Sequence, residues 1–229
     1  MSGQLPLALR WPAHQRFESF HAGPNAVVLD RLRALAQGVD VAWLYLHGGA
    51  GSGRSHLLIA TCAAASAQGR SAQYLPLARL GAERASAIRG FGGSDLLAID
   101  DVDAIAGDRD AEHALFDLYN RCHAERATLL FAASAAPAQL GIGLPDLVSR
   151  LGACIQLALK PLDEVERRSL LRERALARGI ELDDSALDWL FTRRKRDVAT
   201  LLGLLERIDA ASLAAKRRVT VPFLRTLFD

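Results

Sequence analysis

A glycine-rich segment at residues 48–55 constrains the fold of this sequence more than any other feature. It reads Gly-Gly-Ala-Gly-Ser-Gly-Arg-Ser, follows the apolar run from Val41 to Leu46, and precedes a helical pattern from about Arg54 to Gln68. In a strand–loop–helix unit, glycines let main-chain N–H groups close around phosphate oxygens, and the amino terminus of the helix adds the positive end of its dipole. The segment therefore predicts a phosphate-binding P-loop within an α/β fold.

Arginine replaces the usual lysine of the G-x-x-x-x-G-K-[ST] pattern in this loop. Arg54 keeps a positive charge, but its planar guanidinium differs from a compact ammonium group. The replacement weakens the case for rapid hydrolysis more than the case for binding. Ser55, the next residue, is placed to hold a magnesium ion. We therefore expect a bound nucleotide with Mg²⁺, and weak or no ATPase activity of the chain's own.

Two carboxylates, Asp100 and Asp101, directly follow another apolar run at 96–99. One carboxylate at a strand end can hold the water shell of a metal ion, and its neighbour can orient an attacking water. Alone, such a pair is more typical of a solvated acidic turn. Together with the P-loop, it predicts the second half of a P-loop NTPase site.

Short apolar runs alternate with helical patterns up to Lys160, and this alternation predicts a parallel sheet with helices on both faces. A helix is predicted near 109–125, and Pro76 indicates a strand that ends there or lies at a sheet edge. The five predicted strands are 41–46, 73–77, 96–99, 129–133 and 154–159.

The sequence changes character at Pro161. Helical spacing from there on predicts a small all-helical lid domain, in which only 219–221 has strand character. Before residue 17, Pro6 and Pro12 and the lack of a sustained period predict an extended tail. The predicted lid helices are 163–178, 183–195 and 197–215, and the predicted domains are 1–16, 17–160 and 161–229.

The composition excludes several other classes. The longest aliphatic run, Leu57 to Ala67, is too short and too rich in alanine to cross a bilayer. The first residues show no signal peptide, so a cytoplasmic protein is expected. The net charge of +2 is too balanced to indicate a nucleic-acid partner. The widely spaced Cys62, Cys122 and Cys154 are expected to be buried free thiols.

Several segments in this order resemble the AAA+ region of the DnaA family of bacterial replication proteins. They are Phe20–Asn25, the phosphate loop with the following His-Leu-Leu, Ile99–Asp101, and Leu144–Leu151. Arginine in the loop and the segment Phe116–Arg121 make the chain more similar to regulators of the initiator than to the initiator itself. The sequence also stops where the initiator's helix-turn-helix domain would begin, so DNA contact is expected only through a partner.

The resemblance implies roles at particular positions. Arg150 stands at the arginine-finger position, from which it would act in trans on a partner's nucleotide; without the resemblance it would be an ordinary surface arginine. Ser55, Asp100 and Asp101 would hold Mg²⁺, partly through water. The implied residues of the ADP or ATP site are Phe20 and Asn25 beside the adenine, and Gly48, Gly51, Ser52, Gly53, Arg54, Ser55 and His56 around the phosphates.

Two positions depart from the family pattern. After the fourth predicted strand, where a polar sensor is usual, Ser134 is the remaining candidate. In the lid, Ala199 stands where the family has a sensor arginine, with Arg194 and Arg196 nearby. Both losses suggest a nucleotide held as a structural ligand.

The tail contains Gln4-Leu5-Pro-Leu7-Ala-Leu9, which resembles the peptide that binds the sliding clamp (beta subunit) of DNA polymerase III. An extended peptide can place alternate aliphatic side chains in a groove. The alternative is that these leucines cover a seam of their own domain.

These features and the resemblance imply an adaptor with two partners, DnaA and the sliding clamp, and leave a homodimer open. It would promote hydrolysis of DnaA-bound ATP and so restrain initiation of replication. The first alternative is a self-contained AAA+ ATPase, such as a DnaC-type helicase loader that binds single-stranded DNA. The second alternative is a P-loop kinase or nucleotide-transferring enzyme, but the helical lid and the lack of an acceptor-pocket motif argue against it.

Overall fold

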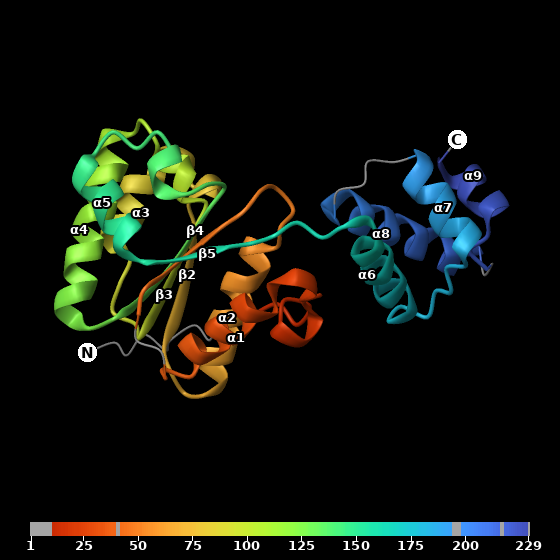
Figure 1. Ribbon diagram of the computed structural model, residues 1–229, viewed down its shortest axis with the longest axis horizontal. Helices are drawn as coiled ribbons and strands as arrows, with labels where there is room; N and C mark the ends of the chain where they lie inside the picture. Colours follow the sequence, from red (N-terminus) through yellow and green to blue (C-terminus); the bar gives the residue numbers. More distant parts are fainter. Residues whose placement is uncertain (1–10, 40–41, 194–197, 216–217, 229) are drawn as a thin grey trace, which may run out of the picture. The chain divides into compact units, whose positions relative to one another are not determined.

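The computed structural model describes residues 11–39, 42–193, 198–215 and 218–228. The chain divides into two compact units, residues 1–160 and 161–229 (Figure 1). None of the described helices is long and apolar enough to span a membrane.

The first unit is built on a five-stranded sheet in which every neighbouring pair of strands is parallel. The strand order is β2-β3-β4-β1-β5, which confirms the predicted parallel sheet and places β2, which ends at Pro76, at an edge. The strands are β1 Leu44–His47, β2 Ala72–Pro76, β3 Leu96–Asp100, β4 Thr128–Ala133 and β5 Ile155–Ala158.

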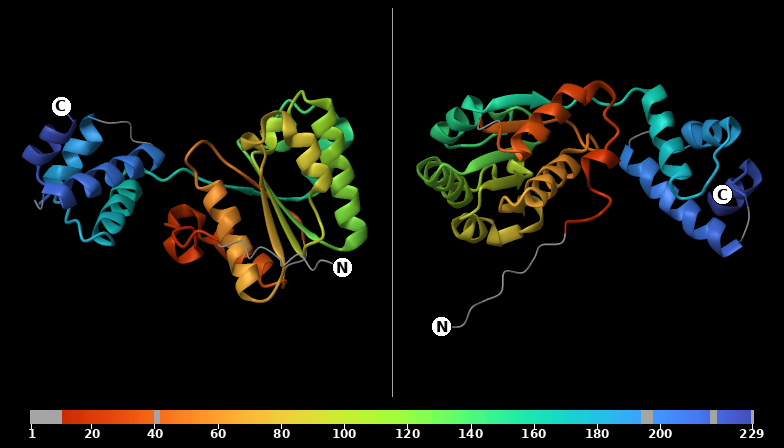
Figure 2. Two further views of the ribbon diagram at one scale, coloured as in Figure 1. Left: turned by 180° about the vertical axis from the view of Figure 1, so that it is seen from behind. Right: turned by 90° about the horizontal axis from the view of Figure 1, so that it is seen from below.

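Helices cover both faces of this sheet, as predicted (Figures 1 and 2). Successive strand residues point to opposite faces, so Tyr45 joins the core under α3, α4 and α5, while Leu44 and Leu46 join the core under α1 and α2. The α-helices of this unit are α1 Ala26–Ala36, α2 Arg54–Ala67, α3 Arg84–Gly90, α4 Arg109–Glu125 and α5 Pro145–Ala153. Short 3₁₀ turns lie at η1 Phe17–Ser19, η2 Gly23–Asn25, η3 Leu77–Arg79, η4 Gly81–Glu83, η5 Val102–Ile105 and η6 Pro137–Gln139.

The described part of the predicted tail, residues 11–16, is not extended. A turn closes through the hydrogen bond from Gln15 N to Pro12 O (3.1 Å). The Trp11 indole N–H donates to Ser66 Oγ on α2 (3.0 Å). The prediction of an extended segment was wrong for these residues, because the chain turns at Pro12 and Trp11 packs against the core under α2.

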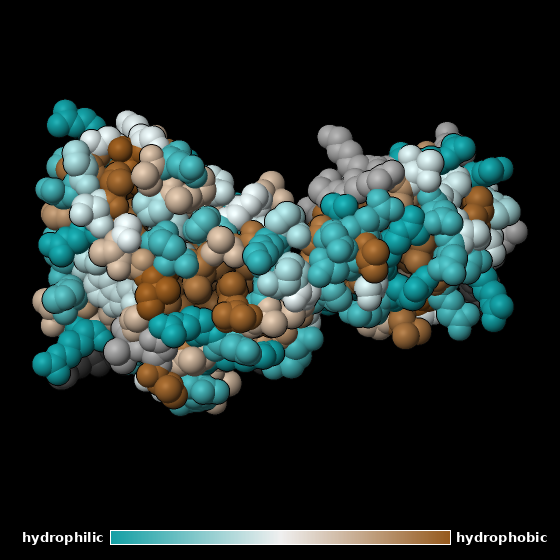
Figure 3. Space-filling model, viewed as in Figure 1, coloured by the Kyte–Doolittle hydropathy of each residue, from teal (hydrophilic) through white to brown (hydrophobic). Residues whose placement is uncertain are grey.

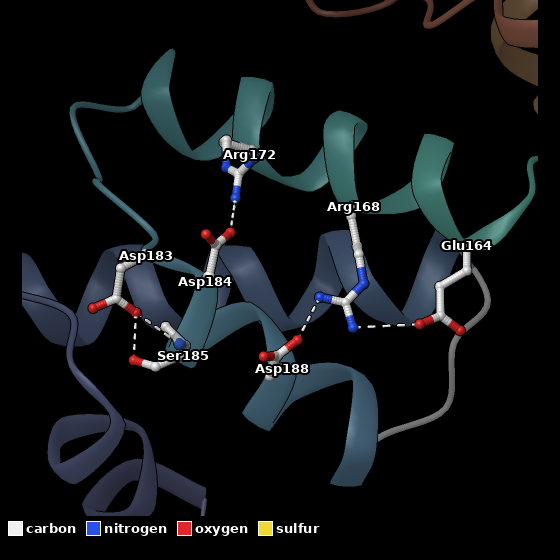
Figure 4. A network of polar contacts seen from close by, with 8 residues as sticks. Glu164, Arg168, Arg172, Asp183, Asp184, Ser185 and Asp188 are labelled. Carbon is white, nitrogen blue, oxygen red and sulfur yellow. Dashed lines mark hydrogen bonds and ion pairs between the residues drawn. The ribbon is translucent and has the colours of Figure 1, made fainter.

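The second unit is a helical domain with its own core, centred on buried residues such as Phe191 and Leu205. Arg168 of α6 pairs with Asp188 of α7 and with Glu164, and Arg172 of α6 pairs with Asp184 of α7 (Figure 4). These polar contacts lie along the α6–α7 interface. The helices are α6 Glu164–Leu176, α7 Asp184–Arg193, α8 Val198–Ala215 and α9 Val221–Phe228.

The strand character of 219–221 was misleading, because Val221 begins α9. Pro222 stands in the first turn of this helix, where a missing N–H costs nothing. Val219 is buried in the lid core and Val221 packs against it, so these β-branched residues serve packing.

The edge strand β5 is only partly covered, and Ile155 is 37% exposed. Figure 3 shows apolar surface in the part of the α/β unit where Figure 1 draws β5.

Candidate nucleotide-binding site

The phosphate loop connects the end of β1, an inner strand of the sheet, to the start of α2. Its first residue is fixed by the hydrogen bond from Gly48 N to Ala133 O of β4 (3.3 Å), and on the other side Leu159 N donates to His47 O (2.7 Å). Gly51 and Gly53 have φ angles of +73° and +92°, a left-handed conformation that strongly favours glycine. The loop is therefore held open at the carboxyl ends of the strands, where α/β folds bind ligands.

Two of the predicted glycines also allow close packing. A Cβ on Gly53 would lie 2.5 Å from Cε2 of Phe20, and one on Gly48 would lie 2.9 Å from Cβ of Leu159. The Phe20 ring also makes an edge contact with His56, at a centroid distance of 5.4 Å. The fold thus brings Phe20 to the phosphate loop.

Two polar atoms of this loop are buried and unpaired within the described residues. They are Oγ of Ser52 and Nη1 of Arg54. Buried polar atoms without a partner are costly and call for an explanation. A hydroxyl and a guanidinium nitrogen are both donors to phosphate oxygen, so the loop residues fit the phosphates of a nucleotide.

Asp100 lies at the end of β3, 1% exposed, and both of its oxygens accept hydrogen bonds. Oδ1 accepts from the main-chain N–H of Asp101 (2.9 Å), and Oδ2 accepts from the Tyr74 hydroxyl (2.8 Å). Burial and the Asp100 charge raise the pKa of Tyr74, while the Ser55 hydroxyl acts in the opposite direction. Tyr74, Ser55 and Asp100 therefore share one corner of the site.

Asp101 follows in a left-handed conformation, with φ of 55°. Burial, and then the Asp100 charge, raises the pKa of its carboxyl group, while Arg54 lowers it. The electrostatic link between Arg54 and Asp101 joins the phosphate loop to the acidic strand end. Within the described ranges, no group of three or more His, Cys, Asp and Glu side chains could hold a metal ion by itself, so a magnesium site here needs phosphate or water ligands.

The sensor candidate Ser134 lies just after β4 and is exposed. Its main-chain N–H donates to Oδ1 of Asp103 (2.8 Å). Sequence reasoning missed Asp103 and Tyr74, since both act through contacts with residues that are distant in the chain.

His56 and Asn25 make hydrogen bonds to other residues of the chain. Nε2 of His56 lies 2.9 Å from Arg16 O and 3.4 Å from Ser19 Oγ. Asn25 is 2% exposed; its Nδ2 donates to Lys160 O (3.0 Å) and its Oδ1 accepts from Lys160 N (2.8 Å). Their predicted contacts with a nucleotide stay predictions.

Arg150 is exposed near the end of α5. This helix packs on the sheet face opposite the one that α2 covers. Its guanidinium lies over the ring of Tyr119, with Cζ 5.6 Å from the ring centroid. The structure therefore does not group Arg150 with the phosphate-loop residues.

Some predicted residues lie outside the described residues. These are Gln4, Leu5, Leu7, Leu9, Arg194, Arg196 and the side chain of Ala199. The three cysteines are described, and all are buried and free.

The fold and site together define a class. A parallel sheet ordered β2-β3-β4-β1-β5, a glycine loop after β1, an acidic end on β3 and a following helical lid are the features of a P-loop AAA+ protein. Residues 13–158 match the family model of the bacterial DnaA ATPase domain, and residues 163–228 match that of the Hda lid domain. The chain belongs to the DnaA family, as an Hda/DnaA-like AAA+ protein related to replication initiation.

Solved structures with this fold include DnaA proteins. Domain III of DnaA from Thermotoga maritima is 21% identical, with a TM-score of 0.80 over 95% of this chain and 97% of that one. A replication initiator DnaA bound to AMPPCP and single-stranded DNA is 20% identical, with a TM-score of 0.74 over 91% and 70%. A RuvB variant from Thermotoga maritima is 18% identical, with a TM-score of 0.68 over 95% and 71%.

Proposed function

We propose that this protein is a regulatory AAA+ adaptor that promotes hydrolysis of the ATP bound to DnaA and thereby prevents over-initiation of replication. Arg150 supports this proposal most directly. It is an exposed arginine on the sheet face opposite α2, and the resemblance to the DnaA family implies that it acts as an arginine finger. A guanidinium aimed at the phosphate charge of a partner's nucleotide accelerates hydrolysis by orders of magnitude.

The chain's own site holds an adenine nucleotide in this proposal. The unpaired Ser52 Oγ and Arg54 Nη1 support it, as does the DnaA structure that contains AMPPCP. The phosphates would lie along Gly51–His56, with Phe20 and Asn25 on the adenine side. Mg²⁺ would neutralise phosphate charge, held by Ser55 and by Asp100 and Asp101, partly through water. Arg54 in place of lysine makes this nucleotide a structural ligand, ADP or ATP, that the chain hydrolyses slowly or not at all.

The sliding clamp is the proposed second partner, bound through Gln4, Leu5, Leu7 and Leu9. The peptide pattern supports this, because alternate aliphatic side chains suit a groove on a partner. The clamp would place the adaptor on DNA in the cytoplasm, beside DnaA.

The test is single-turnover hydrolysis of radiolabelled ATP preloaded on DnaA. The reaction contains clamp loaded on DNA, and the adaptor is added with ADP or omitted. We expect hydrolysis to accelerate only when adaptor and clamp are both present. Hydrolysis of free ATP by the adaptor alone, with no effect on DnaA-bound ATP, would instead support the self-contained ATPase.

A further inference from the structure

The guanidinium of Arg150 lies over an aromatic ring rather than beside a carboxylate. Its Cζ is 5.6 Å from the ring centroid of Tyr119 on α4. Asp146 stands one helical turn earlier on α5, a spacing that commonly gives an ion pair. Within the described residues, however, neither Arg150 nor Asp146 takes part in an ion pair.

The ring beneath Arg150 is a fixed part of the core. Tyr119 is only 7% exposed. Its ring makes an edge contact with Trp43, at 4.4 Å between centroids and an interplanar angle of 79°, and stacks on Phe131 at 6.5 Å. Trp43 is fixed in turn, because its indole N–H donates to Ala127 O (3.0 Å). The surface under the guanidinium therefore has a defined position.

Helix α4, which carries Tyr119, also fixes the start of α5. Glu112 of α4 is 2% exposed, and its carboxylate accepts from the main-chain N–H groups of Gly143 (3.0 Å) and Leu144 (2.9 Å), and also from that of Gly107 (2.9 Å). Leu144 is the residue before the first turn of α5. Helix α4 thus sets both where α5 begins, through Glu112, and where Arg150 rests, through Tyr119.

We propose that Tyr119 is the positioning residue for Arg150: its ring orders the guanidinium before a partner arrives and leaves the positive charge unneutralised. This inference rests on the proposed function, in which Arg150 acts on a partner's nucleotide. A carboxylate would order the side chain as well, but it would cancel part of the charge that the partner's phosphates need. A ring face attracts a guanidinium through its quadrupole and carries no net charge. Because the Arg150 side chain is already ordered in the free protein, binding of the partner does not bear the entropic cost of ordering it.

The first test compares two substitutions of Tyr119 in single-turnover hydrolysis of DnaA-bound ATP at saturating adaptor. Tyr119→Leu should lower the rate about two- to fivefold, the range of an exposed cation–π contact. Tyr119→Phe keeps the ring and should retain the wild-type rate. Equal losses in the Leu and Phe variants would overturn the proposal.

The second test needs no partner and separates this inference from the proposed function. In the free protein, the Nε–Hε resonance of Arg150, assigned by its loss in Arg150→Ala, should show a ring-current shift that persists in Tyr119→Phe and disappears in Tyr119→Leu. Thermal unfolding of each variant controls for folding. A resonance that is unaffected by Tyr119→Leu would overturn the positioning role. Failure of the wild-type protein to stimulate hydrolysis by DnaA would instead overturn the proposed function. The resonance would still show whether the Arg150 guanidinium lies on the Tyr119 ring.

Discussion

The phosphate loop (residues 48–55) and the surface of α5 that carries Arg150, here called the α5 face, belong to one α/β unit. Their polar groups differ in environment. In the loop, Ser52 and Arg54 each have a buried polar atom that lacks a partner among the described residues, which suits the phosphate binding proposed there. On the α5 face, Arg150 is exposed and rests on a ring, so its charge is available to another molecule. In the proposed function, this one domain therefore retains a ligand at one site and offers a charge to a partner from another.

Arg150→Ala should produce the largest effect and should separate the two sites. Loss of an arginine finger lowers hydrolysis by about a thousandfold or more, so stimulation of DnaA-bound ATP hydrolysis should disappear. Binding of ADP to the variant, measured by calorimetry, should equal that of the wild type. Arg109→Ala, which removes another exposed arginine of the same unit, is the matched control and should stimulate normally. Weakened ADP binding by Arg150→Ala would show that the two sites are not separate.

The clamp peptide should act independently of both sites. Burial of one leucine contributes about 1.5–3 kcal/mol, so alanine at Gln4, Leu5 and Leu7 together should weaken clamp binding about a hundredfold or more. The measurement is binding to immobilised clamp. The melting temperature should stay unchanged, because a tail peptide contributes little to a domain core. A drop in melting temperature like that of a core substitution would mean that the leucines pack on their own domain.

Gly53→Ala should damage the loop and leave the α5 face intact. The added Cβ would lie 2.5 Å from the Phe20 ring, in a backbone with φ of +92°. Strain of about 1–3 kcal/mol is expected in this conformation, which corresponds to roughly tenfold or more in ADP affinity. Gly49→Ala is the matched control, since nothing lies within 4 Å of its Cβ position. Similar ADP affinities for the two variants would contradict the loop geometry.

The smallest expected effect is a difference in the alkylation rates of two buried thiols, one near each site. Burial raises the pKa of Cys62, on α2, and of Cys154, beside α5, to about 12. Both thiols are therefore protonated at pH 8 and should react with iodoacetamide only after local opening, which removes the burial that raises their pKa. ADP at five times its dissociation constant should slow labelling of Cys62 about sixfold if that opening releases the ligand, and should slow Cys154 less. Mass spectrometry follows each site; equal protection would mean that the two faces open together.

The sequence predicted what depends on local pattern. The phosphate loop, the acidic end of β3 and the five strands follow from residue types at short spacings, and the structure has them. The short helices α3 and α5 escaped prediction, because seven and nine residues give little periodicity. The run 219–221 was misread as a strand because it contains two β-branched valines, the second of which begins α9.

Much of the site's support depends on contacts that no local pattern contains. Asn25 binds the main chain of Lys160, 135 residues away. Tyr74 on β2 donates to Asp100 on the neighbouring strand β3. Asp103 in η5 accepts from the main-chain N–H of Ser134. Glu112 looks like a solvated helix residue in the sequence and is buried in the structure. Such pairings are set by tertiary packing, so they require the fold to be known.

In the proposed function, the chain retains one nucleotide and acts on another that DnaA holds. The direct measurement is single-turnover hydrolysis with the radiolabel placed either on DnaA-bound ATP or on ATP bound to this protein, with clamp on DNA in both reactions. We predict that hydrolysis accelerates only when the label is on DnaA, and that Arg150→Ala removes this acceleration without changing the slow loss of label from the chain's own site. Acceleration of the chain's own nucleotide, lost in Arg150→Ala, would contradict the account.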